Sequence, residues 1–142
     1  ALANEFNNIL SINNITPLVP LVFAEAENLS SYFNTKFDLV IARNCLDHVI
    51  SPVDAFAEMV KVVKPNGFIW IEVHRNEAIY ENYEGFHQWN IDEYEGDIIV
   101  WSKRSCAFLK QKIDRTLLHF SYTINSGKND KDTIEIIAQV GE

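Results

Sequence analysis

The sequence feature that most constrains the fold is a strand, helix, strand pattern in the middle of the chain. Residues 37–42 (FDLVIA) and 68–74 (FIWIEVH) are mainly apolar runs of strand length, typical of parallel strands that are buried on both faces. Ser51 and Pro52 between them start a helix, because serine caps an N-terminus and proline suits the first turn. Residues 65–67 (PNG) stop that helix. Short links between the three elements predict a βαβ unit whose two strands run parallel with a right-handed crossover.

The rest of the chain adds elements on both sides of this unit, without an internal repeat. Apolar periodicity near the N-terminus predicts a helix, and an apolar run bounded by prolines predicts a short strand. The predicted elements are a helix over 1–10, a strand over 19–24, a short helix or turn over 26–33, a hairpin with strands 89–94 and 97–102, a helix over 103–116, and antiparallel strands over 117–124 and 132–140 joined by a polar turn over 125–131. This order indicates the α/β class, with a mostly parallel sheet and a C-terminal antiparallel strand.

The composition limits the classes of function. With 142 residues, 47% of them hydrophobic, the chain suffices for one globular domain. No apolar run approaches the roughly 20 residues of a membrane-spanning helix, so no membrane partner is expected. A net charge of −8 disfavours a nucleic-acid partner, because an acidic surface repels phosphate backbones. Two cysteines far apart in the sequence argue against a disulfide framework and favour a reducing, cytoplasmic location.

Residues 37–72 carry a resemblance to a known family. The stretch FDLVIARNCLDHVISPVDAFAEMVKVVKPNGFIWIE resembles the class I S-adenosylmethionine-dependent methyltransferases, type 11-like, in its order of strand, polar exit, H-V-x-x-P, helix, K-P-G-G turn and strand. Asn66 replaces the first glycine of that turn, and asparagine also tolerates a left-handed backbone. The resemblance implies a Rossmann-like methyltransferase sheet and S-adenosylmethionine as the cofactor.

The resemblance also implies that part of the family's fold is missing from this sequence. The family's Gly-rich turn after its first strand, and the acidic residue that ends its second strand, have no counterpart here. Residues 1–142 are therefore interpreted as a partial methyltransferase domain that lacks the first two strands and carries an inserted loop and hairpin at about 75–103. The edge of the strand at 37–42 is then open, and an open apolar edge invites pairing with another chain. We expect a homodimer through this edge, capture of a neighbour's edge, or a longer parent protein.

Two segments match positions that hold the cofactor in that family. FAEAENL, residues 23–29, resembles the segment that binds the adenine: Glu25 matches the acidic acceptor, and Ala26 matches the residue whose N–H meets a ring nitrogen. The exit of the first central strand matches the residues on the methionine and ribose side of the cofactor, which are Ala42, Arg43, Asn44 and His48. Two simpler interpretations stay open: Glu25 is merely solvated, and Arg43 forms a surface ion pair with Asp47.

Histidines supply the candidate bases for methyl transfer, because imidazole titrates near physiological pH and the reaction needs an aligned nucleophile that can lose its proton. The candidate bases are His48, His74 and His87. The candidate groups for binding a polar acceptor are His74, Asn76, Gln88 and Trp89. Alternatively, Trp89 and Trp101 pair across the hairpin and only cover the core. The four histidines and two cysteines lack C-x-x-C and H-x-x-x-H spacing, so no metal site is predicted.

These observations predict a methyltransferase, or a fragment of one, that transfers a methyl group from S-adenosylmethionine to a small polar molecule. Cofactor binding by this chain alone is expected to be weak unless a partner completes the site. The alternative is a non-catalytic, partial Rossmann-like domain that serves as a scaffold or dimerisation module. A nicotinamide dinucleotide enzyme is disfavoured, because the Gly-rich turn that it needs is absent and such folds usually lack the terminal antiparallel strands.

Overall fold

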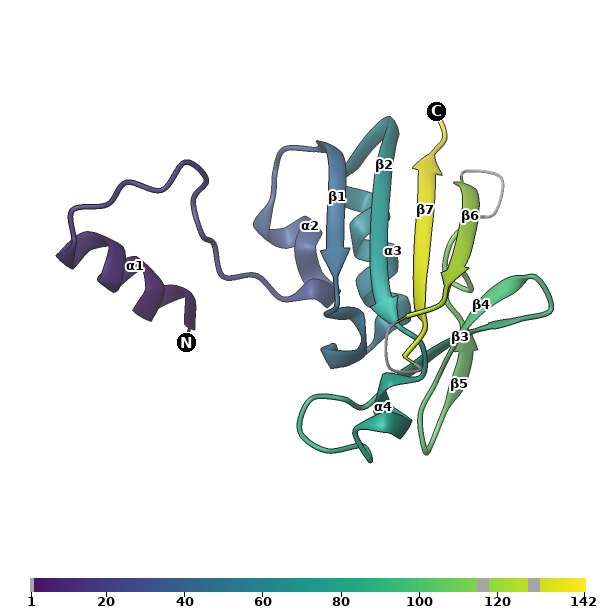
Figure 1. Cartoon of the computed structure of the whole chain (residues 1–142). Helices are drawn as coiled ribbons and strands as arrows, with labels where there is room; N and C mark the ends of the chain where they lie inside the picture. The colour runs from purple at the N-terminus through teal and green to yellow at the C-terminus, as the bar shows by residue number, and fades with distance from the viewer. Residues whose placement is uncertain (1, 115–117, 128–130) are drawn as a thin grey trace.

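The computed structural model describes residues 2–114, 118–127 and 131–142, and its main element is a four-stranded sheet (Figure 1). The strands follow the order β1 (Phe37–Arg43), β2 (Val63–His74), β7 (Thr133–Val140) and β6 (Leu118–Asn125). β1 and β2 are parallel, whereas β7 is antiparallel to both β2 and β6. Three of these strands therefore run in one direction and a C-terminal strand opposes them. This arrangement confirms the predicted α/β class and the predicted antiparallel pair.

The helix between β1 and β2, α3 (Pro52–Val62), begins where the sequence predicts. The Ser51 hydroxyl accepts a hydrogen bond from the Asp54 N–H at 3.3 Å, as expected of an N-cap. A second cap comes from a distant part of the sequence, because Glu27 Oε1 accepts hydrogen bonds from the N–H groups of Ile50 at 2.6 Å and Ser51 at 3.0 Å. Negative charge is stabilising at a helix N-terminus. Glu27 thereby ties the segment before β1 to the start of α3.

The turn from α3 into the main part of β2 depends on two adjacent residues. Asn66 has a φ of 64°, the left-handed conformation that asparagine tolerates. Gly67 has no space for a side chain, because a Cβ there would lie 2.9 Å from the carbonyl oxygen of Asp38 and 2.7 Å from Cγ1 of Val63. The predicted turn is therefore kept, although asparagine stands where the family pattern has glycine.

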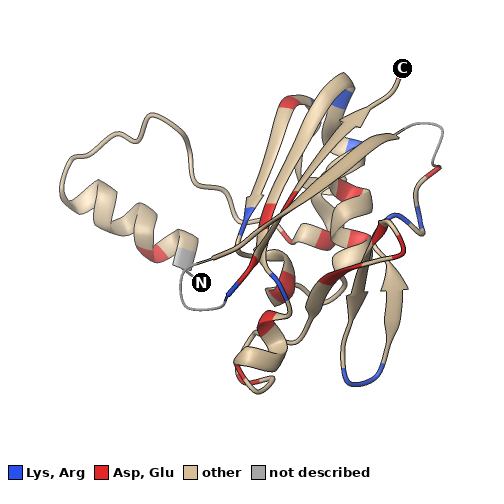
Figure 2. Cartoon of the chain, turned by 45° about the vertical axis from the view of Figure 1, so that its right-hand side comes forward, with Lys and Arg blue, Asp and Glu red and all other residues tan. Residues whose placement is uncertain are grey.

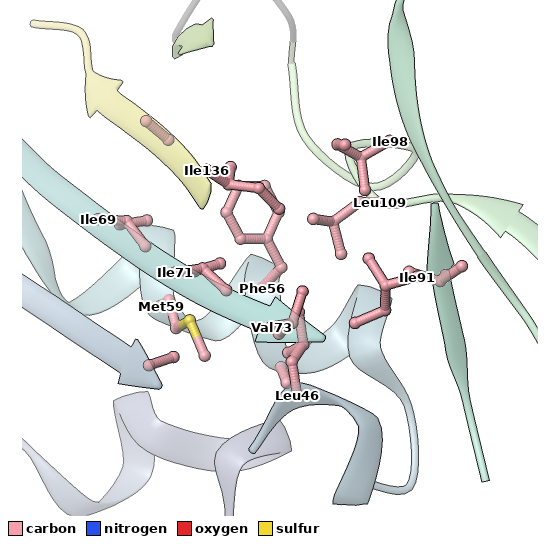
Figure 3. Close-up of a cluster of buried hydrophobic side chains, with 14 of the residues drawn as sticks. Leu46, Phe56, Met59, Ile69, Ile71, Val73, Ile91, Ile98, Leu109 and Ile136 are labelled. Atoms are coloured by element: carbon pink, nitrogen blue, oxygen red, sulfur yellow. The ribbon is translucent and has the colours of Figure 1, made fainter. Parts of the chain in front are cut away.

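One face of the sheet is buried and forms the core (Figure 3). A second sheet packs there, with β3 (Asn90–Tyr94), β4 (Asp97–Trp101) and β5 (Cys106–Phe108) in antiparallel order, which confirms the predicted hairpin. Phe56 of α3 lies among side chains from β2, β7 and this second sheet. The fully buried side chains of the cluster include Leu46, Phe56, Ile69, Ile71, Ile91, Ile98, Leu109, Ile134 and Ile136.

The opposite face of the four-stranded sheet is uncovered in the part of the chain that the structure describes. Leu39 and Ile41 in β1 are 50% and 60% exposed, and Phe68 in β2 is 43% exposed. Alternating burial along β2 is typical of a sheet with one solvated face. The prediction that both central strands are buried on both faces is therefore wrong, because no described layer packs on this side.

The segment before β1 also differs from the prediction. Residues 19–24, predicted as a strand, are irregular and mostly exposed. No described strand lies alongside them to pair with their backbone groups, and Pro20 has no N–H to donate. The predicted helices on either side are present, as α1 (Leu2–Ile12), which lies apart from the sheet in Figure 1, and as η1 (Ala26–Asn28) followed by α2 (Leu29–Tyr32).

The helix predicted over 103–116 is absent from the described residues 103–114, which is a further correction. The Ser102 hydroxyl accepts hydrogen bonds from the N–H groups of Arg104 at 3.2 Å and Ser105 at 3.3 Å, so the chain turns back and forms β5 instead. The end of the predicted helix and the start of the next predicted strand, 115–117, and part of the predicted polar turn, 128–130, lie outside the described residues. None of the described helices is both long and apolar enough to span a membrane.

Candidate active site

The chain leaves β1 through a sharp bend at the carboxyl edge of the sheet. Asn44 has a φ of 48°, and its N–H donates a 2.7 Å hydrogen bond to the carbonyl oxygen of Glu72 in the neighbouring strand. The bend leads into η2 (Leu46–His48), whose first two side chains are buried. Since β1 and β2 are parallel and in register there, Asn44 and the end of β2 at His74 share one edge, as the sequence predicts.

Three polar side chains meet at this edge. His87 Nδ1 lies 2.7 Å from Asp47 Oδ2 and 3.1 Å from His48 Nε2, and His48 Nε2 lies 3.3 Å from the same carboxylate oxygen. The side chain of Asp47 is only 4% exposed, whereas those of His48 and His87 are 36% and 29% exposed. The structure therefore brings two of the predicted bases together around a buried carboxylate, here called the Asp47–His48–His87 cluster.

The loop that carries His87 is anchored to the η2 region by its neighbours. The Gln88 N–H donates to the carbonyl oxygen of Asp47 at 3.3 Å, and the indole N–H of Trp89 donates to the carbonyl oxygen of Val49 at 3.0 Å. The Gln88 side chain holds the loop itself, because its Nε2 donates to the carbonyl oxygen of Tyr83 at 3.0 Å. The Trp89 side chain is thus held against the η2 region by this hydrogen bond. The predicted pairing of Trp89 with Trp101 is not formed, since Asn90 is the residue opposite Trp101.

Asn90 fixes the other end of this loop from inside the protein. Its side chain is fully buried, its Oδ1 accepts from the Ile79 N–H at 3.0 Å, and its Nδ2 donates to the Tyr83 hydroxyl at 2.9 Å. These bonds link β3 to α4 (Glu77–Tyr80) and to the loop. A buried amide with both ends paired is a rigid support, because breaking either bond leaves a polar group unsatisfied.

A cavity of about 550 Å³ opens beside His48. Its walls come from the η2 region, the loop before β3 and the turn between β4 and β5. The lining residues include His48, Tyr83, Phe86, Gln88, Trp89, Ser102, Lys103 and Arg104. Three predicted residues, His48, Gln88 and Trp89, therefore share one cavity, and its size suits a small molecule.

Two other predicted site residues lie away from the cavity lining. His74 is the last residue of β2, and its Nδ1 is buried without a hydrogen-bond partner among the described residues. Asn76 has a φ of 54°, and its Nδ2 donates to Asp92 Oδ2 at 2.7 Å. Hydrogen bonds from Arg75 and Asn76 to Asp92 outweigh the effect of burial and hold the pKa of that carboxyl below its ordinary value. Asn76 therefore has a structural partner already.

The predicted cofactor residues lie on both sides of the β1 exit. Glu25 is exposed and directly precedes η1, while Ala26 is half-buried, and η1 packs against α3. Ala42 is buried at the end of β1. Arg43 Nε donates to Glu72 Oε1 at 2.7 Å. Arg43 therefore forms its ion pair with Glu72, and the alternative pair with Asp47 is not present.

Sequence reasoning missed Asp47 and Glu27 as important residues. Asp47 is adjacent to His48 in the sequence, but nothing in the sequence indicates that His87, 40 residues further on, shares its carboxylate. Cys45 lies in the same bend. Desolvation and the nearby Asp47 carboxylate raise the pKa of its thiol above the ordinary value.

The fold and the edge cluster together define an α/β domain with a cavity outside the carboxyl ends of its parallel strands, the position where open α/β sheets bind their ligands. Comparison with known proteins identifies the kind of α/β domain. The family described as methyltransferase domain matches residues 3–71. No curated protein sequence gives a significant match.

Several solved structures similar to this chain are named as methyltransferases. An S-adenosylmethionine-dependent methyltransferase from Clostridium acetobutylicum ATCC 824 is 12% identical with a TM-score of 0.55, over 98% of this chain and 71% of that one. N-methyltransferase NodS from Bradyrhizobium japonicum WM9, in complex with S-adenosyl-L-homocysteine, is 13% identical with a TM-score of 0.60, over 96% of this chain and 62% of that one. A protein from Clostridium thermocellum assigned as an rRNA methylase is 10% identical with a TM-score of 0.56, over 97% of this chain and 69% of that one.

The chain therefore has a fold like that of S-adenosylmethionine-dependent methyltransferases over nearly its whole length, and residues 3–71 match the methyltransferase-domain family. The resemblance predicted from the sequence is confirmed at this level. The matching family is described as a methyltransferase domain, and the NodS structure contains S-adenosyl-L-homocysteine, the product form of the methyl-donor cofactor. Because one similar structure is assigned to rRNA methylation, the absence of a nucleic-acid partner stays a prediction.

Proposed function

We propose that this chain is an S-adenosylmethionine-dependent methyltransferase, or a part of one, that methylates a small polar molecule bound in the cavity beside His48. The observation that carries the proposal is the shared carboxyl edge: the bend at Asn44, the end of β2 and the Asp47–His48–His87 cluster lie together there. In an open α/β sheet this is the edge at which a cofactor binds. A cavity at the same edge gives the acceptor a place next to it.

On the cofactor side, we propose that Glu25 and Ala26 contact the adenine, and that Ala42, Arg43, Asn44 and His48 line the methionine and ribose side. The exposed Glu25 carboxylate is free to accept from an amino group, and the backbone of the nearby η1 is held in place because Glu27 caps α3. The guanidinium of Arg43 is already paired with Glu72, so Arg43 is expected to contribute through its main chain. The left-handed bend at Asn44 turns the chain along this edge, toward His48.

On the acceptor side, we propose that Gln88 and Trp89 form part of the wall against which the substrate packs, with His74 and Asn76 further out. The cavity also carries an unusual charge for an acidic protein. Lys103 and Arg104, at the basic tip between β4 and β5 seen in Figure 2, make no ion pair with a described carboxylate. Most other described lysines and arginines do pair with one, for example Lys61, Lys64 and Lys110. Lys103 Nζ lies over the Tyr83 ring, 4.3 Å from its centroid, and keeps its charge without a described carboxylate. Two cations without a carboxylate partner on one cavity favour an acceptor that carries an anionic group.

The chemical step needs alignment and removal of a proton. The sulfonium methyl of S-adenosylmethionine is already activated, so the protein must place a nucleophile behind it and take up the proton that the nucleophile loses. We propose that His48 and His87, oriented by Asp47, serve this purpose, because His48 both belongs to the cluster and lines the cavity. His74 is the weaker candidate, since it belongs neither to the cluster nor to the cavity lining.

Calorimetric titration with S-adenosylhomocysteine tests the proposal. The chain is expected to bind it weakly, and Glu25→Gln is expected to weaken binding about 10-fold, the effect of one lost charge-assisted hydrogen bond. Glu84→Gln, at an exposed acid in the loop before β3, is the matched control and should leave binding unchanged. Absence of any binding at millimolar S-adenosylhomocysteine would contradict the methyltransferase proposal for this chain. Equal binding by Glu25→Gln would remove Glu25 from the site.

A second candidate function has one observation in its favour. β1 is the last strand on its side of the sheet within the described residues, and its apolar residues Leu39 and Ile41 are half exposed or more. An unpaired apolar edge is a template for another chain. We therefore propose, as the alternative, a non-catalytic Rossmann-like module that dimerises through β1.

We further propose that residues 1–142 are a partial domain lacking the family's first two strands, with residues 75–103 as an insertion. The chain spans 62% to 71% of the length of the three similar structures, which supports this proposal.

We also propose a reducing, cytoplasmic location for the protein. Cys45 and Cys106 are free thiols, which supports this location.

A further inference from the structure

We propose that the Asp47–His48–His87 cluster binds a divalent transition-metal ion, with Zn²⁺ as the reference ion. Among the described residues, this is where one carboxylate and two imidazoles converge closely enough to share one ion. The proposal rests on the three side chains themselves and does not depend on the methyltransferase function.

The distances fit a metal site. The three atoms Asp47 Oδ2, His48 Nε2 and His87 Nδ1 form a triangle with sides of 2.7, 3.1 and 3.3 Å. A tetrahedral Zn²⁺ ion with bonds of about 2.0–2.2 Å holds its ligand atoms roughly 3.3 Å apart. Shifts of a few tenths of an ångström in the two partly exposed imidazoles would open the triangle to that size.

The chemistry of the three atoms also favours a cation. A carboxylate oxygen only accepts hydrogen bonds, and each neutral imidazole has one donor and one acceptor nitrogen. His87 Nδ1 faces both Asp47 Oδ2 and His48 Nε2, and one proton on it can point to only one of them. A bound metal ion would satisfy the lone pairs of all three atoms at once. Two histidines and one carboxylate are a donor set that suits zinc, iron and related ions.

The surroundings provide rigidity on one side and access on the other. Asp47 is buried, and its carbonyl oxygen accepts from the Gln88 N–H, which ties the two ligand-bearing segments together. His48 lines the cavity, so the open side of the triangle is adjacent to the space that an acceptor would occupy. Three protein ligands with an open fourth position are typical of catalytic rather than structural zinc sites.

A metal at this position would explain how an acceptor hydroxyl loses its proton. An oxygen bound to Zn²⁺ has a strongly lowered pKa, so an acceptor hydroxyl held there would lose its proton to water in the open cavity near neutral pH. In that case the two imidazoles act as ligands and the ion, rather than a free imidazole, acidifies the acceptor. The sequence-based prediction of no metal rested on local spacing, which does not register ligands 39 or 40 residues apart.

Titration of the chelator-treated chain with ZnCl₂ and CoCl₂ tests the inference. One equivalent of Zn²⁺ is expected to bind with a dissociation constant below about 1 μM, and Co²⁺ should give the intense visible absorption of a four-coordinate site. Asp47→Asn and His87→Ala should each weaken Zn²⁺ binding at least 10-fold. His119→Ala, at an exposed histidine on β6, is the matched control and should bind as the unaltered chain does.

Variant folding is monitored in the metal-free state by circular dichroism. His48→Ala provides a second test on an exposed side chain if a buried variant fails to fold. No stoichiometric binding by the unaltered chain, or binding unchanged in His48→Ala, would overturn the inference. Titration with S-adenosylhomocysteine in the absence of metal reports on the proposed cofactor site separately, so failure of one proposal is distinguishable from failure of the other.

Discussion

The N–H of Asn44 donates a 2.7 Å hydrogen bond to the carbonyl oxygen of Glu72, and this bond joins the exits of the two parallel strands. It places the bend after β1 next to the end of β2, so that polar residues from both strands reach one edge of the sheet. Without the parallel pairing, Asn44 and His74 would lie at opposite ends of the molecule. The candidate site therefore depends on the βαβ unit that the sequence predicts.

Glu27→Ala is expected to destabilise the protein, whereas Glu25→Ala is not. Glu27 accepts two N–H groups at the start of α3, and loss of hydrogen bonds to a charged group costs about 1–3 kcal/mol of the free energy of unfolding. Glu25 is exposed, so Glu25→Ala should change the free energy of unfolding by no more than about 0.5 kcal/mol. Urea denaturation of both variants measures the difference. Equal stabilities would show that Glu27 does not cap α3.

Gly67→Ala is expected to lower the free energy of unfolding by about 1–3 kcal/mol, because the added Cβ would meet the carbonyl oxygen of Asp38 and overpacking costs this much. Asn66→Gly is the neighbouring control. Its backbone is already left-handed, so glycine there should be tolerated without loss. Thermal unfolding followed by circular dichroism compares the two, and an unchanged melting temperature for Gly67→Ala would contradict the close packing.

Asp92 is expected to make stability depend on pH in the acid range. Its folded-state pKa lies below the unfolded value of about 3.9 because Arg75 and Asn76 donate to it. A depressed pKa stabilises the folded state above the unfolded pKa, and this stabilisation is lost as the pH falls through the folded pKa. Asp92→Asn should cost about 1–3 kcal/mol at pH 7, and the difference from the unaltered chain should shrink toward pH 3. Glu84→Gln, at an exposed acid, should show no such convergence.

Self-association is expected through the uncovered part of β1. Ile41→Lys places a charge on an exposed apolar position of this edge strand and should shift the chain toward the monomer in light scattering coupled to size exclusion. Ile12→Lys is the control, since Ile12 is 79% exposed on α1, away from the sheet. A chain that is monomeric at all concentrations would rule out the proposed dimer.

The sequence by itself determined the central unit of this protein. Ser51 caps a helix, residues 65–67 turn the chain, and two apolar runs flank them, all of which are local preferences that act over a few residues. The terminal antiparallel strands and the hairpin before them follow equally from local alternation and turn residues. These features can be predicted without knowledge of distant contacts, because the sequence signals that indicate them are local.

Only the tertiary structure decided which faces are buried and which side chains meet. Residues 19–24 have the composition of a strand, but a strand needs a partner for its backbone groups, and none of the described strands lies beside them. Leu39 and Ile41 are apolar yet exposed, because burial depends on what packs against a strand. His87 meets Asp47 across 40 residues since the loop before β3 docks on η2 through Gln88 and Trp89. Such contacts between distant segments leave no local pattern, so the cluster became visible only in three dimensions.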